Sequence, residues 1–276
     1  MEPLLRHKLN NMKNRILILL SAVLISLGAN AQTVTLKQVG KDNILISSSL
    51  WISAHSSGSL YSVDQTNSIY KTDLATGEYS RVGKASYSNL KFFFTLNNRL
   101  YVIDNDGSMT QIDPVSGNWS VVSNMGYWRE ITNVVVVANT FYAIENGVLF
   151  KYSGFNTATR KQIGEAEFYN PGFLFKYENA LYSMISGGSF YEINTGTGAW
   201  KKIAKSKNWK GNLSAVVKDK LYTIDDSGAL TETALSDGTK KQIDNSQFKK
   251  SRFLFEEAGK LYTRTSEGNL YEIVIN

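Results

Sequence analysis

The sequence predicts an all-β fold, a six-bladed β-propeller of four-stranded units, and three observations predict it. The phrase Leu-Tyr, once replaced by Phe-Tyr, begins at positions 60, 100, 141, 181, 221 and 261, so the repeat is 40 or 41 residues long. Around each phrase, apolar residues alternate in short runs, which is typical of half-buried strands. Gly or Asn marks tight hairpins between the runs. A tandem repeat of this length without helical segments predicts propeller blades.

Each repeat is expected to contain four strands in a constant order. An apolar run, such as residues 92–94, comes first, and the strand with the Leu-Tyr phrase comes second. A turn seven residues after the Leu, at Gly107 in the second copy, leads to the third strand. Another turn, seventeen residues after the Leu, at Gly117 in that copy, precedes the fourth strand. The third copy lacks this second glycine.

The two ends of the chain predict how the ring closes. The last copy stops at Asn276 without its fourth strand, whereas residues 34–40 match the fourth strand of the third copy at residues 159–164. We therefore expect the N-terminal strand to complete the C-terminal blade, which leaves six closed blades and removes open sheet edges. An open solenoid is the structural alternative, but it would leave the strands at both ends unpaired.

The first 31 residues are typical of a secretory signal peptide. Four basic residues precede an apolar run at residues 16–27, and the sequence Ala29-Asn-Ala31 supplies a cleavage site. The run is shorter than the ~20 residues of a membrane-spanning helix, so an uncleaved anchor is the weaker alternative. We expect a signal peptide at residues 1–31, one propeller domain at residues 32–276, no membrane span after cleavage, and a secreted or periplasmic location. The Ala-Gln junction resembles that of exported proteins of the Bacteroidetes.

Composition limits the classes of function. Without residues 1–31 the chain keeps 26 basic and 23 acidic residues, a net charge of about +3 that favours neither nucleic-acid nor membrane binding. The chain has no Cys and two His, of which only His55 lies outside the signal peptide. We therefore expect no cofactor and no metal site, and a Ser-His-Asp triad would have to use His55.

Carboxylates are the remaining candidates for catalysis. Asp104-Asn-Asp-Gly107 begins like a calcium-binding loop, but it lacks the third ligand and the distal Glu. The same residues suit an ordinary hairpin turn. No spacing singles out a catalytic pair, since the separation of two carboxyl groups is a three-dimensional property.

The connections between successive repeats supply the predicted ligand-binding residues. Each of five connections carries an aromatic residue, and these loops should share one face of the propeller with the hairpins between second and third strands. There the aromatics would stack on sugar rings or pack against a protein, while basic neighbours would favour an anionic ligand. Alternatively, the rings fill the space between blades. The candidates are Tyr87, Tyr127, Trp128, Tyr169, Lys207, Trp209, Lys210, Phe248 and Lys249.

Residues 181–200 resemble the repeats of quinoprotein-like and kelch-like propellers. The shared pattern is a strand, a Gly turn, an apolar-Tyr strand, then Thr-Gly and an aromatic residue. Quinoprotein enzymes carry eight blades and a regular Trp motif, whereas here only Trp119 and Trp200 occupy that position. The resemblance therefore implies the fold and argues against a quinone cofactor.

These observations predict an exported, monomeric, non-catalytic binding module that recognises a glycan or a protein partner through its loop face. Two alternatives stay open. One is a hydrolase, lactonase or lyase that uses carboxylates at the central channel, with or without calcium. The other is a structural subunit of a cell-envelope complex.

Overall fold

The structure is a computed structural model that describes residues 32–41, 53–64, 66–137, 139–155, 159–163, 168, 171–185, 189–205 and 213–276. The predicted signal peptide at residues 1–31 lies outside the described residues. The chain divides into two compact units, one of Met1–Val34 with Ile275–Asn276, and the other of Thr35–Val274. In the first unit, Thr33 and Asn276 exchange two backbone hydrogen bonds of 3.2 and 3.0 Å.

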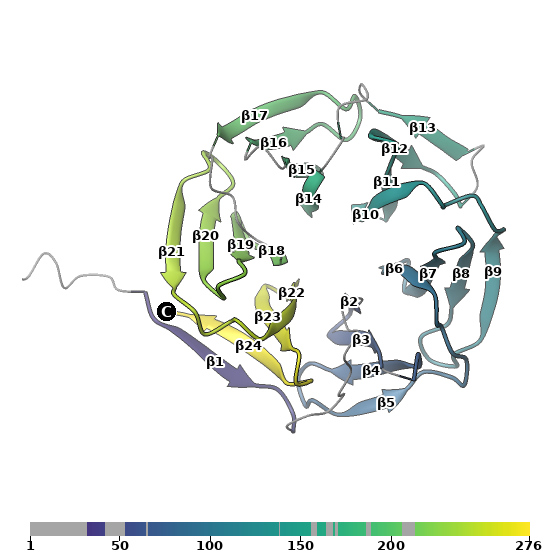
Figure 1. The fold of residues 1–276 in the computed structure, drawn as a ribbon, viewed down its shortest axis with the longest axis horizontal. Coiled ribbons are helices and arrows are strands. Elements are labelled where there is room, and N and C mark those ends of the chain that lie inside the picture. Colours follow the sequence, from purple (N-terminus) through teal and green to yellow (C-terminus); the bar gives the residue numbers. More distant parts are fainter. Residues whose placement is uncertain are drawn as a thin grey trace, which may run out of the picture. The chain divides into compact units, whose positions relative to one another are not determined.

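The described residues form six antiparallel sheets of four strands each, which confirms the predicted all-β propeller. Within the large unit the sheets surround a centre, each with its first strand innermost (Figure 1). The first sheet consists of β2 (Ser53–Ser56), β3 (Ser59–Val63), β4 (Ile69–Asp73) and β5 (Tyr79–Arg81). The second consists of β6 (Leu90–Leu96), β7 (Arg99–Asp104), β8 (Met109–Ile112) and β9 (Trp119–Ser123). The third consists of β10 (Ile131–Val137), β11 (Thr140–Glu145), β12 (Val148–Tyr152) and β13 (Arg160–Gln162).

The other three sheets repeat this order, except that the last one takes its outer strand from the start of the chain. The fourth sheet consists of β14 (Pro171–Tyr177), β15 (Ala180–Ile185), β16 (Ser189–Ile193) and β17 (Trp200–Lys205). The fifth consists of β18 (Leu213–Val217), β19 (Lys220–Ile224), β20 (Leu230–Ala234) and β21 (Lys240–Asp244). The sixth consists of β22 (Ser251–Glu257), β23 (Lys260–Thr265), β24 (Leu270–Ile275) and β1 (Val34–Gln38).

The Leu-Tyr phrase lies on the second strand of every sheet, as predicted, and holds neighbouring sheets together. Successive side chains of a strand point to opposite faces, so each Leu and each Tyr enters a different core. Tyr61 shares one apolar cluster with Leu100, and Tyr101 shares the next cluster with Phe141. All twelve residues of the six phrases are at most 8% exposed. The phrase recurs because each junction between two blades is filled by the Tyr of one blade and the Leu or Phe of the next.

The ring closes as the sequence predicts. The innermost strands contact one another in the circular order β2, β6, β10, β14, β18, β22 and back to β2. Beyond β1, the backbone N–H of Val39 donates to the carbonyl oxygen of Leu270 at 2.9 Å. The Val39 side chain packs in the cluster that also holds Leu60 and Tyr262, which belong to the first and last blades.

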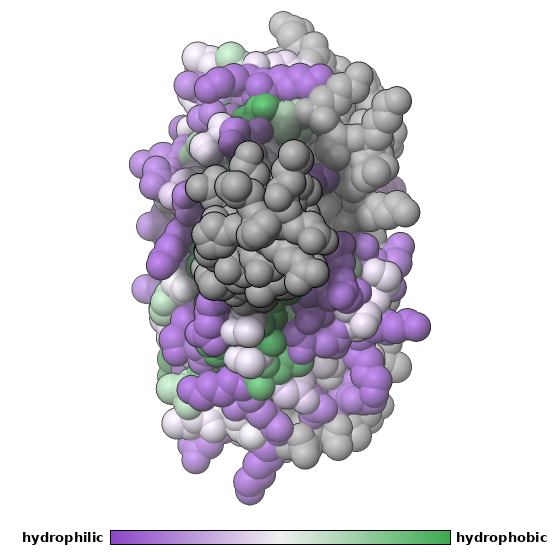
Figure 2. All heavy atoms as spheres, turned by 90° about the vertical axis from the view of Figure 1, so that its left-hand side faces the viewer, coloured by the Kyte–Doolittle hydropathy of each residue, from purple (hydrophilic) through white to green (hydrophobic). Residues whose placement is uncertain are grey.

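The side of the molecule that carries β21 shows mainly hydrophilic side chains among the described residues (Figure 2). Lys240 and Lys241 on β21 and Lys37 on β1 are among the basic residues of the outer strands. No helix in the described part of the chain is long and apolar enough to cross a membrane.

Candidate functional site

The connections between blades meet the hairpins between second and third strands, as the sequence predicts. In four described blades the backbone N–H of the aromatic residue donates to a carbonyl oxygen at the tip of that hairpin. The pairs are Tyr87 with Asn67 at 2.8 Å, Trp128 with Gly107 at 3.0 Å, Phe168 with Gly147 at 2.9 Å, and Phe248 with Gly228 at 3.2 Å. All four acceptor residues have positive φ. A Cβ atom on Gly228 would lie 2.3 Å from the backbone nitrogen of Lys249, so the close approach of the loop requires glycine.

Most of the described loop aromatics point into the molecule. Trp128 and Phe248 are each 1% exposed, and Tyr87 is half-buried against the core between the first two sheets. The Trp128 ring lies 5.4 Å from Phe141 and 4.9 Å from Tyr152, measured between ring centroids. We therefore assign Trp128 and Phe248 to the packing between blades instead of a ligand surface, because a buried ring cannot stack on a ligand.

Two of the predicted residues remain accessible on the loop face. Tyr127 is 43% exposed, and Lys249 is also exposed. Four others, Tyr169, Lys207, Trp209 and Lys210, lie outside the described residues. The acidic turn at Asp104 closes the β7–β8 hairpin, where the Asp106 carboxylate accepts a hydrogen bond from the backbone of Ser108 at 2.8 Å. The described residues hold no group of three or more His, Asp or Glu side chains that could bind a metal ion.

A cavity lies in the centre of the large unit. Its volume is about 620 Å³, and the first strands of all six sheets line it. It also contacts Ser57, Asn97 and Asn139, which belong to hairpins between first and second strands. Those hairpins lie at the opposite end of the first strand from the aromatic loops, because neighbouring strands are antiparallel. The cavity therefore extends toward the face opposite to the predicted binding face of the aromatic loops.

One register position supplies most of the chemical character of this cavity. In each sheet, one residue of the first strand lies five positions before the Leu or Phe of the phrase. This residue pairs with that Leu or Phe, which lies on the second strand. All six of these residues line the cavity, and we call them the channel ring. The channel ring consists of His55, Thr95, Val136, Lys176, Val216 and Glu256.

His55 is held by a carboxylate from the neighbouring blade. Its Nδ1 lies 2.9 Å from Oε2 of Glu257, whose Oε1 accepts the backbone N–H of Gly58 at 2.8 Å. The hydrogen bond from His55 lowers the pKa of the Glu257 carboxyl, and the Gly58 amide and the Lys176 charge lower it further against the opposing effect of burial. The imidazole also lies 5.1 Å from the Phe255 ring. Glu257 is thus kept ionised and fixes the orientation of the imidazole.

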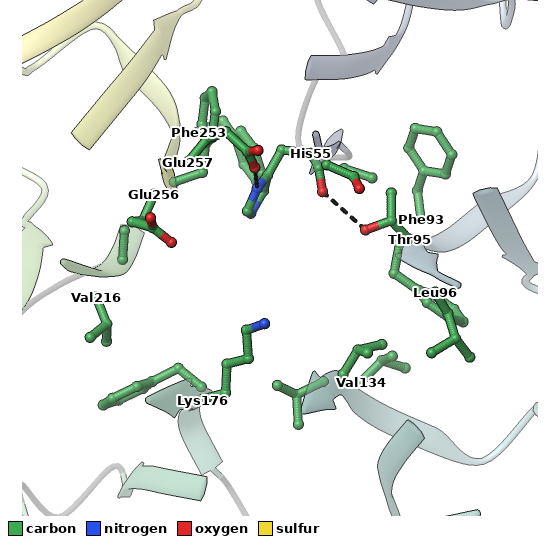
Figure 3. A pocket seen from close by; sticks show the side chains of 18 of the residues that line it. His55, Phe93, Thr95, Leu96, Val134, Lys176, Val216, Phe253, Glu256 and Glu257 are labelled. Atoms are coloured by element: carbon green, nitrogen blue, oxygen red, sulfur yellow. Dashed lines mark hydrogen bonds and ion pairs between the residues drawn. The ribbon is translucent and has the colours of Figure 1, made fainter. Parts of the chain in front are cut away.

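Lys176 reaches into the same cavity from the other side. Figure 3 shows its ammonium in the middle of the channel, across from His55, while the Glu256 carboxylate projects from the β22 side. Val134 and Val216 supply apolar wall between these charged groups. The Glu256 carboxylate also accepts the backbone N–H of Gly259 at 2.7 Å. The channel therefore combines an ammonium, two carboxylates and an imidazole with apolar side chains and with uncharged Ser, Thr and Asn side chains.

The sequence predicts an isolated His55, whereas the structure brings His55 together with Lys176, Glu256 and Glu257, none of which is among the predicted site residues. A comparison of the copies at the position five residues before each Leu would have revealed the channel ring. That position is occupied by His, Thr, Val, Lys, Val and Glu, while the neighbouring phrase hardly varies.

Comparison with known proteins supports the fold. Neither a protein-family model nor a curated protein sequence matches this chain. A structure of unknown function from Bacteroides thetaiotaomicron is similar, with a TM-score of 0.61 and 11% identity over 89% of this chain and 76% of that chain. Virginiamycin B lyase from Staphylococcus aureus has a TM-score of 0.55 and 10% identity, over 88% of this chain and 99% of that one.

A third similar structure is PorZ, a surface component of the type-IX secretion system of Porphyromonas gingivalis. It has a TM-score of 0.54 and 10% identity, over 85% of this chain and 37% of PorZ. At such low identity the three similarities show the shared propeller fold and nothing finer.

Proposed function

We propose that this protein is an exported binding module that takes its ligand into the central channel. The observation that carries the proposal is the channel ring. The Leu-Tyr phrase, which serves packing, stays apolar and aromatic in all copies, whereas the channel ring changes from charged to apolar residues between copies. The channel ring places an imidazole, an ammonium and a carboxylate at one level of a 620 Å³ cavity. Cavities with apolar walls and a few converging polar groups are the usual ligand sites of proteins.

The chemistry of the walls favours a peptide segment of a protein partner over a glycan. Lys176 offers an ammonium to a carboxylate, while Glu256 and Glu257 face the same space and would pair with a basic group. The apolar wall would pack against uncharged side chains of such a segment. A neutral glycan carries no charge that could pair with Lys176, Glu256 or Glu257, although the Ser, Thr and Asn side chains of the lining could donate hydrogen bonds to it.

Export is supported by the N-terminal sequence pattern and is in keeping with PorZ, which is itself a surface component. The proposed mature chain begins at Gln32.

The test uses the chain 32–276 with a peptide array and a glycan array probed side by side. We expect binding to mixed-charge peptides that is lost in Lys176→Ala and in Glu256→Ala. Val216→Thr is the matched control, because it changes the same register position without removing a charge, and it should keep binding. Binding only to glycans, removed by Tyr127→Ala or Lys249→Ala, would assign the function to the loop face and overturn the channel proposal.

The His55–Glu257 pair favours one second candidate, a lyase or hydrolase at the channel. In the neutral tautomer that donates its Nδ1 proton to Glu257, the imidazole of His55 would carry an Nε2 lone pair that takes a proton from a substrate. Lys176 would stabilise negative charge that develops across the channel. A screen of ester, lactone and uronate substrates would detect this activity. It has to be abolished by His55→Gln and kept in Val216→Thr; a turnover that survives His55→Gln would rule out this pair as the catalyst.

A further inference from the structure

The outermost strand of the second sheet, β9, differs from the outermost strands of the other sheets. Its sequence, Trp119-Ser-Val-Val-Ser123, contains no charged residue. Each of the other five outer strands contains at least one Lys or Arg, and β17 contains three Lys. Charged residues on an edge strand, Lys above all, prevent it from pairing with another chain. β9 therefore lacks the protection that its five counterparts share.

Apolar side chains are also concentrated at β9. Among the described residues, six large hydrophobic side chains are exposed, and five of them lie on β9 or beside it. Trp119 and Val121 are 58% and 55% exposed and project from the same face of the strand, while Val115, Met125 and Tyr127 flank it. Single exposed apolar residues are common on protein surfaces, but a group of them marks an interaction site.

The backbone of β9 is open on one side. β9 pairs with β8 and ends its sheet, so among the described strands none follows it. In Figure 1 it lies on the rim of the large unit. Its outward N–H and C=O groups, together with Trp119 and Val121, offer both the hydrogen bonds and the apolar contacts that an added strand would use.

We propose that β9 pairs antiparallel with β9 of a second copy of this chain, giving a two-fold symmetric dimer with a continuous eight-stranded sheet. Centred on Val121, this pairing sets Val121 opposite itself and Trp119 opposite Ser123. No like charges meet, because the strand has none. The same self-pairing of β13 would set Lys161 against Lys161. A strand without charged residues can pair with the same strand of a second copy without electrostatic repulsion. A two-fold interface needs such self-complementarity, because the same surface lies on both sides. The proposal replaces the monomer expected from the sequence.

Sedimentation of the chain 32–276 at increasing concentration tests this dimer. We expect a monomer–dimer equilibrium that shifts to dimer by mass action. Val121→Lys should raise the dimer dissociation constant more than about tenfold, because two ammonium groups would face each other at the two-fold axis. Ser80→Lys, which adds the same charge to the exposed outer strand β5, is the control and should leave the equilibrium unchanged.

Cysteine cross-linking gives an independent test that does not depend on affinity. The chain has no Cys, so Val121→Cys would introduce its only thiol at the proposed axis. Oxidation should link Val121→Cys chains into dimers and leave Ser80→Cys chains monomeric. A wild-type chain that stays monomeric at all concentrations would overturn the proposal. A dimer that persists unchanged in Val121→Lys, or cross-links equally through Ser80→Cys, would overturn the assignment to β9.

Discussion

Glu257 connects the polar side of the channel to the first blade. Its two carboxylate oxygens receive separate hydrogen bonds, one from His55 of the first blade and one from the backbone of Gly58 in the same blade. Glu257 itself lies on β22 of the last blade, so these bonds join the two blades at the point where the ring closes. Because hydrogen bonds to an ionised carboxylate favour the charged form, they account for its lowered pKa.

The lowered pKa predicts how stability depends on pH. A carboxyl group whose pKa is lower in the folded than in the unfolded chain stabilises the fold above the unfolded value, about 4.3 for Glu. This stabilisation is lost as the pH falls through the lower folded-state pKa. Glu257→Gln keeps the size of the side chain and removes its charge, so it should be less stable than the wild type at neutral pH.

Urea unfolding of both proteins between about pH 7 and about pH 3 measures this difference. The gap in the free energy of unfolding should shrink as the pH falls. Glu267→Gln is a suitable control because the Glu267 side chain is half exposed, in an ion pair with Lys250. A gap for Glu257→Gln that stays constant with pH would show that its charge does not stabilise the fold.

At the scale of elements, two sets of side chains hold each blade against the next. The phrase on the second strand fills the middle of the junction, and the aromatic residue of the connecting loop fills its edge. At the junction of the second and third blades, Trp128 belongs to the same cluster as Tyr101 and Phe141. The backbone N–H of Trp128 donates to the carbonyl oxygen of Gly107, and this hydrogen bond holds the loop where the Trp128 ring enters the junction. Packing therefore accounts for an aromatic residue in these loops.

Neighbouring residues of one loop allow a direct test of this packing. Trp128→Ala would leave a cavity between blades and should lower the free energy of unfolding by about 3–5 kcal/mol. Tyr127→Ala removes an adjacent but exposed ring and should change it by no more than about 0.5 kcal/mol. Chemical denaturation measures both values. Equal losses for the two variants would contradict the assignment of Trp128 to the core.

At the scale of the whole molecule, closure joins segments from the two ends of the chain. β1 completes the sheet of β22, β23 and β24, so two sequence-distant segments hydrogen bond in one blade. Val39, just after β1, adds a buried side chain to the cluster shared by the last and first blades. Without this contact the last sheet would lose part of its attachment to the first.

Val39→Ala should therefore weaken the closure of the ring. The loss of two buried methyl groups predicts a decrease of about 2 kcal/mol in the free energy of unfolding. Val115→Ala makes the same change at an exposed turn and serves as the control. Limited proteolysis should also cleave the Val39→Ala variant faster than the control. If the two variants unfold alike, Val39 does not hold the ring closed.

Much of the fold was predictable because its determinants are local and repeated. Glycine at the β7–β8 turn, alternation along the strands and the phrase at 40-residue spacing all act within one blade. The closing strand was predictable as well, since residues 34–40 carry the pattern of a fourth strand. The surroundings of the loop aromatics were not predictable from the sequence. A residue recurs once in each blade whether it packs between blades or contacts a ligand, so its periodicity does not distinguish the two.

The strand order, the number of blades and the closure of the ring thus follow from the sequence pattern, because hairpins and strands depend on near neighbours in the chain. The burial of Trp128, and the position of His55, Lys176 and Glu256 at one level of the channel, became visible in the folded molecule alone. These three residues are separated by 80 residues or more along the chain. They converge because each innermost strand faces the same axis, and the closed ring brings equal register positions to equal depth.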